Sequence, residues 1–294
     1  MFRQMGEKVR ELRLYHQFTQ KELALDICSQ ATISKIEKGE IQPTSIIVHQ
    51  LAMRLGVDAN YFFSDYEAPL LNDAQNSSDQ ILRMIRKSQY KQAMRLIEHE
   101  IHNPLFQTNP LKKFILWAHG VCYYYLENSE RVALASLNEA QQITLQQSSP
   151  DFAMEAEILV SKAIIESDKN NHQQADQMFC QALTISNQVS PSQLTLFVRI
   201  HYHHSKTHMK LQQTKQAFSL IDDAIDEVIR ARSMYMLGEL YVQRGYCRYL
   251  LGENREAIND YKDSLWVFEK QKNDILYDDA VRYLNKIEKN EQFV

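Results

Sequence analysis

The chain has 294 residues, which is long enough for one large domain or two modest ones with buried cores. Hydrophobic residues make up 44% and charged residues 24%, as in a globular protein, but only 7 glycines and 6 prolines are available for tight turns. This scarcity and the lack of GxGxxG and GK[ST] motifs exclude β-sandwiches, barrels, dinucleotide-binding folds and P-loop ATPases, and favour an all-α chain. The net charge of −4 means that any contact with nucleic acid must come from a local patch.

The amino terminus, the length of the apolar runs and the cysteines indicate the cellular compartment. The amino terminus lacks an apolar signal core, and no run approaches the roughly 18 apolar residues of a membrane span, so we expect a cytoplasmic protein without a membrane partner. Cys28, Cys122, Cys180 and Cys247 are far apart and form no CxxC motif. We therefore expect reduced thiols, with no disulfide, no metal and no cofactor.

Residues 1–65 carry the signals of several short helices. Thr19 and Glu22 form a capping box, which predicts a helix from about Gln20 to Ile27. Ser29 then caps a second helix, which Gly39 ends. Two short helices with so brief a turn predict a helix-turn-helix.

The second of these helices predicts a surface that reads DNA. Ile33 and Ile36 point inward, which leaves the amino-terminal side of the helix for base edges. The residues expected there are Gln30, Ala31, Thr32 and Lys35. Gln20 and Thr44 are expected to meet phosphates, and Lys21 and Lys38 to add charge. Any short capped helix pair looks like this, however, and the 8 basic residues of this region are balanced by 8 acidic ones.

A longer stretch of sequence favours a DNA-binding domain over an arbitrary pair of capped helices. The segment FTQKELALDICSQATISKIEKGEIQPTSIIVHQLAMRLGV, from Phe18 to Val57, resembles the lambda-repressor-like (XRE) DNA-binding family. In that family an arginine of the first helix pairs with the glutamate of the IExG segment. The resemblance therefore implies a structural pair between Arg13 and Glu37.

Beyond residue 65 the pattern changes from a junction to a repeat. Residues 66–78 combine Pro69 with Asn, Ser and Asp and predict a linker. Residues 79–294 then repeat an alanine with an apolar residue four positions later, at spacings of 40, 42, 42 and 40. These alanines are Ala93, Ala133, Ala175, Ala217 and Ala257. They predict five helical hairpins stacked as a lengthened tetratricopeptide-like α-solenoid, with a capping helix over 274–289.

Such a solenoid offers a concave face suited to an extended peptide or a partner helix. Counting back from each repeat alanine places charges of both signs and several tyrosines there. They are Arg86, Tyr125, Glu157, Arg199, Tyr202, Lys206, Glu239, Tyr246 and Tyr249. This mixture suits a short peptide with a free carboxylate and apolar side chains, although charges and tyrosines occur on the surface of every helix.

A group of histidines invites a metal interpretation. His204 and His208 are one helical turn apart, and His201 and His203 lie nearby. No glutamate follows as in HExxH, and His201, His204 and His208 fall where the two helices of one hairpin pack together. We therefore expect packing rather than metal binding, and no catalytic signature is evident.

The whole chain resembles the PlcR-type peptide-sensing regulators of Gram-positive bacteria. TQKELALDIC and TISKIEKG carry the resemblance in the first part, and YHHSK (202–206) and LGELYVQRGYC (237–247) in the second. It implies a quorum-sensing homodimer that binds operator DNA when a short signalling peptide occupies the repeats. Positions where relatives use asparagine to hold the peptide correspond to Val160 and His203, and Arg86, Lys206, Glu239 and Tyr277 carry over as further contacts.

Two other functions remain open at this point. A peptide-independent repressor of the XRE type would use its repeats only for dimerisation. A repeat protein that binds a response regulator would use them to hold another protein, although such proteins usually carry a helical bundle in place of the helix-turn-helix.

Overall fold

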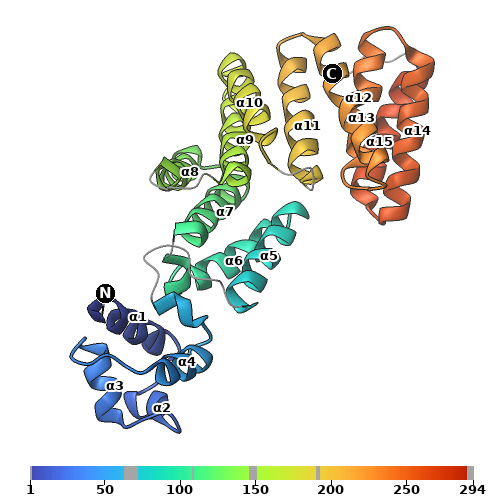
Figure 1. Cartoon of the computed structure of the whole chain (residues 1–294). Helices are drawn as coiled ribbons and strands as arrows, with labels where there is room; N and C mark the ends of the chain where they lie inside the picture. The colour runs from blue at the N-terminus through green and yellow to red at the C-terminus, as the bar shows by residue number, and fades with distance from the viewer. Residues whose placement is uncertain (1, 63–71, 108, 146–150, 190–192, 290–294) are drawn as a thin grey trace. The chain divides into compact units, whose positions relative to one another are not determined.

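The computed structural model describes the chain except residues 1, 63–71, 108, 146–150, 190–192 and 290–294 (Figure 1). The described part holds fifteen α-helices, two short 3-10 helices and no strand, so the predicted all-α class is confirmed. It forms two compact units, Met1–Ser148 and Ser149–Val294, each of which is considered by itself. Among the described residues, no helix has both the length and the apolar character that crossing a bilayer requires.

The first unit begins with a small helical bundle. Its elements are α1 (Phe2–Tyr15), α2 (Gln20–Ala24), α3 (Gln30–Glu37), α4 (Ser45–Arg54) and the 3-10 helix η1 (Ala59–Phe62). The apolar positions that recur at helical spacing form its core, and Val9, Leu12, Leu23, Ile33 and Leu51 have no exposed surface. The predicted helix-turn-helix is therefore present as α2 and α3.

The caps of this bundle follow the sequence closely, with one difference. The Glu22 amide donates to Thr19 Oγ1 at 3.1 Å and the Thr19 amide donates to Glu22 Oε2 at 2.7 Å, which confirms the capping box. The helix ends at Ala24, however, and not near Ile27. Asp26 adopts a left-handed conformation with φ 58°. The Arg54 guanidinium caps the end of the helix by donating a hydrogen bond to the Leu25 carbonyl. These contacts from outside the segment stop α2 three residues early.

Two hairpins complete the first unit. They consist of α5 (Asn72–Arg86) with α6 (Tyr90–Glu100), and α7 (Asn109–Glu127) with α8 (Glu130–Leu145), joined by the 3-10 helix η2 (Pro104–Gln107). Because α5 begins at Asn72, residues 72–78 are helical and the predicted linker is too long; residues 66–71 lie outside the described residues. Ala74 is buried, and Ser77 Oγ donates to Glu100 Oε1 at 3.0 Å, so packing against α6 makes a helix of a polar segment.

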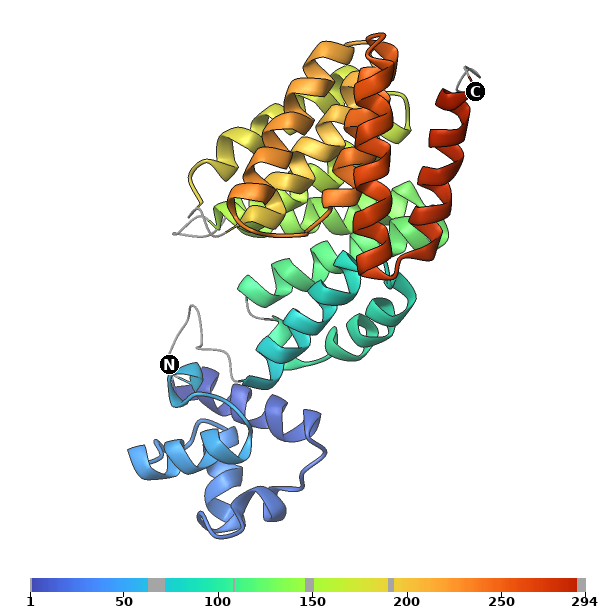
Figure 2. The same ribbon diagram turned by 90° about the vertical axis from the view of Figure 1, so that its right-hand side faces the viewer.

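The second unit contains three hairpins, which follow one another in chain order across Figure 1, and a final helix, which lies beside α14 in Figure 2. They are α9 (Phe152–Asp168) with α10 (His172–Ser186), α11 (Leu194–Lys210) with α12 (Thr214–Arg230), α13 (Leu237–Leu250) with α14 (Asn254–Gln271), and α15 (Asp274–Glu288). Over the described residues this confirms five tetratricopeptide-like hairpins and a C-terminal helix.

The repeat alanines mark the closest helix packing. All five have no exposed surface. At the last hairpin, a Cβ atom on Gly245 would lie 3.0 Å from the Tyr261 ring and 3.3 Å from the Ala257 carbonyl oxygen. Small residues on both helices thus allow the backbones to approach, as the repeat pattern predicts.

A buried ion network holds the last hairpins together. The Arg244 guanidinium donates to Asp260 Oδ1 at 2.7 Å and to Asp222 Oδ1 at 2.7 Å, and Arg248 donates to Asp260 Oδ2 at 2.8 Å. Asp260 is 1% exposed, so two guanidinium groups compensate its buried charge. The network joins α12, α13 and α14 and fixes the register of the helices around the cavity described below.

Candidate functional site

The amino-terminal side of α3 forms an open surface in the first unit. Gln30, Ala31 and Lys35 are exposed and Thr32 is half-buried, whereas Ile33 and Ile36 are buried in the core. Ser29 Oγ accepts from the Thr32 amide at 3.1 Å and fixes the start of the helix. The residues expected to read bases therefore occupy one accessible face, and their contact with DNA remains a prediction.

A buried pair beneath this surface sets the angle between the helices. Arg13 Nε donates to Glu37 Oε1 at 2.6 Å and Nη2 donates to Oε2 at 3.2 Å, which confirms the pair implied by the resemblance. Gln20 Nε2 donates to the same carboxylate at 2.8 Å. The predicted phosphate contact of Gln20 is thus left to the second N–H of its side-chain amide or to its backbone N–H, because one hydrogen of Nε2 holds α2 against α3.

The positive charge of this surface is local. Lys21, Lys35 and Lys38 are exposed on or next to α2 and α3. Lys8, by contrast, donates to the Tyr61 carbonyl at 2.8 Å, and Arg54 binds the carbonyls at the end of α2. Thr44 is exposed and its Oγ1 accepts from the Ile47 amide at 3.4 Å, so the amino terminus of α4 faces outward. A helix amino terminus that faces outward is suited to phosphate groups.

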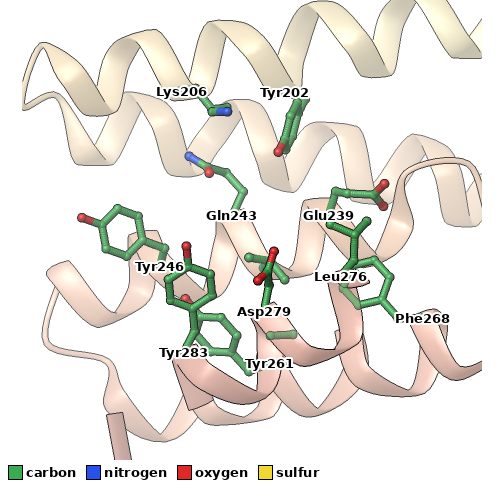
Figure 3. Close-up of a pocket in the computed structure, with 12 residues that line it drawn as sticks. Tyr202, Lys206, Glu239, Gln243, Tyr246, Tyr261, Phe268, Leu276, Asp279 and Tyr283 are labelled. Atoms are coloured by element: carbon green, nitrogen blue, oxygen red, sulfur yellow. The ribbon is translucent and has the colours of Figure 1, made fainter. Parts of the chain in front are cut away.

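The second unit contains a cavity of about 390 Å³ between α11, α13, α14 and α15 (Figure 3). This volume lies in the range of sites that hold small ligands or a few peptide residues. The side chains that line it are Tyr202, Lys206, Glu239, Val242, Gln243, Tyr246, Tyr261, Phe268, Leu276, Asp279, Ala280 and Tyr283. Tyr202 and Lys206 of α11 face Glu239 and Gln243 of α13 in this view.

The cavity combines apolar walls with hydrogen-bond donors, a hydrogen-bond acceptor and a cation. Burial and the nearby Glu239 raise the pKa of Tyr202 to about 12, so its hydroxyl stays a donor. Burial also raises the pKa of Glu239, whose Oε2 is buried and has no hydrogen-bond partner among the described residues. Lys206 Nζ lies 5.6 Å from the Tyr202 ring centroid, and desolvation lowers its pKa. An unpaired acceptor and a partly desolvated cation are groups that a ligand can satisfy.

Four of the predicted peptide residues meet in this cavity, namely Tyr202, Lys206, Glu239 and Tyr246. Two others from the same part of the chain do not line it. Tyr249 packs against the core around Tyr261, and Tyr277 is 37% exposed on α15 outside the cavity lining. Neither residue therefore belongs to this cavity, and their contact with a peptide stays a prediction.

The α15 helix contributes residues that the sequence reasoning missed. Leu276, Asp279, Ala280 and Tyr283 all line the cavity. Their spacing along one helical face is an available signal, but the sequence-based prediction is a capping helix with Tyr277 as its one peptide contact. The cap is therefore also a wall of the site.

Four predicted residues on α9 and α11 are engaged within the protein. Glu157 accepts from the Arg199 guanidinium, which is an ion pair between these helices. Val160 has no exposed surface and belongs to the core formed by α9, α10 and α11, so its assignment as a peptide contact is wrong for this structure. The ring of His203 meets that of Tyr202 edge-on at 5.2 Å, and desolvation holds the pKa of His203 well below its usual value.

Arg86 and Tyr125 lie in the first unit. Arg86 is the exposed last residue of α5. Tyr125 on α7 stacks on Tyr90 of α6 with ring centroids 4.4 Å apart. Their contact with a peptide stays a prediction.

The histidines of α11 pack differently from expectation. His204 is buried, but it stacks on Phe179 and contacts Asp176, both of which lie on α10 of the preceding hairpin. His208 Nε2 lies 3.4 Å from the same aspartate. These two histidines therefore join neighbouring hairpins, whereas we expected them between the two helices of one hairpin.

Comparison with known proteins identifies both parts of the chain. Residues 78–288 match the family described as the RNPP family C-terminal domain, and residues 9–62 match the helix-turn-helix family. No curated protein matches the chain in sequence.

Solved structures match the chain over nearly its full length. PlcR of Bacillus thuringiensis, in complex with the peptide PapR7 and DNA, is 21% identical with a TM-score of 0.64, covering 97% of this chain and 99% of that one. Its apo form is 20% identical with a TM-score of 0.63, covering 97% and 98%. The competence regulator ComR from Streptococcus vestibularis, in complex with its signalling peptide XIP, is 14% identical with a TM-score of 0.56, covering 98% and 99%. At these identities the likeness establishes the fold.

Proposed function

The chain belongs to the RNPP family, and from that premise we propose that it is a peptide-controlled transcriptional regulator. It binds operator DNA through α2 and α3 as a homodimer in the cytoplasm, and a short signalling peptide bound to the repeats controls its activity. It has no catalytic role. The observation that carries this proposal is the coexistence of an accessible recognition helix and a polar-lined cavity of about 390 Å³ in one chain.

The chemistry of the cavity favours a peptide over a purely apolar ligand. Lys206 offers a cation for a terminal carboxylate, and the unpaired Glu239 Oε2 offers an acceptor for a peptide N–H. Phe268, Tyr261 and Leu276 supply the apolar walls for side chains. This alternation of charge and apolar surface is suited to a short chain that carries both a backbone and hydrophobic side chains.

On the DNA side, each chain of the dimer presents one recognition helix. Gln30 is able to pair with adenine and Lys35 with guanine, while Ala31 and the Thr32 methyl group suit a thymine methyl. The half-sites are expected about one helical turn, or a multiple of it, apart, and the affinity falls steeply with salt. The solved relatives PlcR and ComR each form a complex with both DNA and a peptide, which supports this arrangement.

Control follows from a shift between populations. A peptide that binds the DNA-competent dimer a hundredfold better than the alternative form supplies about 2.7 kcal/mol of coupling. A ligand with equal affinity for both forms changes nothing. The peptide therefore has to make contacts that differ between the two states.

The peptide step is tested by equilibrium capture of synthetic short-peptide libraries on the full-length chain. One library has free carboxyl termini and a matched one has amidated termini. We expect saturable retention from the free-carboxyl library, at least tenfold weaker retention by Lys206→Met and Glu239→Gln, and unchanged retention by Tyr277→Ala, which lies outside the cavity lining.

Two outcomes oppose this assignment. An absence of saturable binding with intact DNA binding favours the peptide-independent repressor. Retention that is equal for wild type, Lys206→Met and Glu239→Gln shows that the peptide binds elsewhere on the repeats.

A further inference from the structure

The third and fourth hairpins meet at four side chains of metal-binding chemistry, outside the cavity described above. Asp176 and Cys180 are four residues apart on α10, and His204 and His208 are four residues apart on α11. Residues at this spacing lie on the same helical face, one turn apart. Two neighbouring helices thus each present a pair of potential ligands.

The distances between these groups are those of a compact site. A ligand atom of Asp176, one of Cys180 and one of His204 all lie within 4.8 Å of one another. His204 Nε2 is 2.7 Å and His208 Nε2 is 3.4 Å from Asp176 Oδ1. A tetrahedral zinc ion with bonds of about 2.0–2.3 Å separates its ligand atoms by about 3.3–3.8 Å. Asp176, Cys180 and His204 are therefore near the spacing of ligands around one ion, and His208 is a fourth candidate ligand through its approach to Asp176.

The surroundings hold the two imidazoles in position. The His208 Nδ1 atom lies 2.6 Å from Gln213 Oε1, which leaves Nε2 toward Asp176. This outer hydrogen bond is the usual arrangement for a ligating histidine. The His204 ring is packed between Phe179 and His208, with centroid distances of 5.3 and 4.5 Å, and its side chain is 4% exposed.

The donor set selects among metals. One carboxylate, one thiol and two imidazoles suit zinc, whereas calcium and magnesium prefer oxygen ligands alone. Cys180 is exposed, and the Asp176 side chain is 32% exposed, so an ion has a path from solvent. On binding, the Cys180 thiol loses its proton and the thiolate sulfur coordinates the cation.

We propose that Asp176, Cys180, His204 and His208 form a zinc site that clamps α10 to α11. The alternative is a hydrogen-bonded His–Asp–His cluster that binds no ion. This zinc site fixes α11, which also carries Tyr202 and Lys206 of the cavity. The α9–α10 hairpin thereby stabilises one wall of the cavity. The site stands on its own geometry and does not depend on the identity of the peptide.

The test is a titration of the purified full-length chain with Co²⁺ alone, after the protein has been stripped with a chelator under reducing conditions. Cobalt bound to a thiolate gives a sulfur-to-metal charge-transfer band in the near ultraviolet. We expect this band to saturate at one equivalent and to disappear when Zn²⁺ is added. Cys180→Ser should abolish the band, and His208→Ala should weaken Co²⁺ binding at least tenfold.

Cys28→Ser is the matched control, because it removes a thiol outside the cluster and should leave the band unchanged. Cys180 is exposed and His208 is half-buried, and circular dichroism checks that both variants fold. Absence of the band in the wild type, or its persistence in Cys180→Ser, overturns the proposal and leaves the hydrogen-bonded cluster.

Discussion

The helix-turn-helix and the cavity differ in how the chain builds them. The DNA-reading surface comes from one short segment, in which Thr19, Ser29 and Thr44 cap successive helices and expose the residues between them. The cavity comes from four helices between Tyr202 and Tyr283, and several of its polar groups are desolvated. The exposed side chains of α3 therefore serve recognition apart from stability, although Gln20 of α2 also holds the two helices together. In the cavity, the same side chains serve recognition and stability.

Removal of Glu37 should produce the largest effect. In Glu37→Ala the Arg13 guanidinium stays buried without its carboxylate, and we expect a loss of about 3–5 kcal/mol in the local free energy of unfolding. Hydrogen exchange across residues 2–62 measures it, with the exposed Glu40→Ala as control. The cavity should retain its peptide affinity. A loss below about 1 kcal/mol would show that the pair is dispensable.

An added methyl group at Gly238 tests the cavity side of the comparison. A Cβ atom there would lie 2.4 Å from the ring of Phe268, which lines the cavity. We expect Gly238→Ala to cost about 1–3 kcal/mol by overpacking and to weaken peptide binding at the same time. Urea unfolding and peptide titration measure the two effects. Loss of one without the other would contradict the claim that this region couples packing to recognition.

A change at Lys35 tests whether recognition at the DNA surface can be altered without a change in stability. Lys35→Ala should change base preference at one position of each half-site by about 1–3 kcal/mol and leave the unfolding free energy nearly unchanged. Binding to operators with single base changes measures this, and Lys38→Ala should instead weaken binding to all sequences alike. Equal losses on every sequence would make Lys35 a phosphate contact.

A change of pH should produce the smallest effect. Burial first, and then the charges of Arg199 and Lys206, lower the pKa of His203 in the folded state. The unfolded chain therefore binds more protons as the pH falls through about 6.5, so this contribution to stability is present above that pH and declines below it. Urea unfolding at a series of pH values, with a chelator present, should show a flatter slope for His203→Gln. An unchanged slope would remove His203 from this account.

The contrast between a surface built from one short segment and a cavity built from distant helices explains which features the sequence could predict. The caps at Thr19 and Ser29 and the Arg13–Glu37 pair depend on short-range patterns or on a specific family string, so they were predictable. The buried repeat alanines follow from a regular period. These features account for the helix-turn-helix, the five hairpins and the last helix.

The remaining features depend on packing between distant segments. Asp279 and Tyr283 reach the cavity only because α15 packs on α14, and the shortened α2 depends on Arg54 from another helix. The cluster of Asp176 and Cys180 with His204 and His208 joins two hairpins, and no local pattern connects its halves. Such juxtapositions require the three-dimensional register of the helices.

The central claim is that a peptide controls DNA binding, and genomic DNA selection by the full-length protein tests it most directly. The selection is performed with and without the low-molecular-weight fraction of spent culture medium. The account predicts enrichment of a palindromic site only when that fraction is present, and loss of this response in Glu239→Gln. Equal enrichment under both conditions would contradict peptide control and identify the protein as a constitutive regulator.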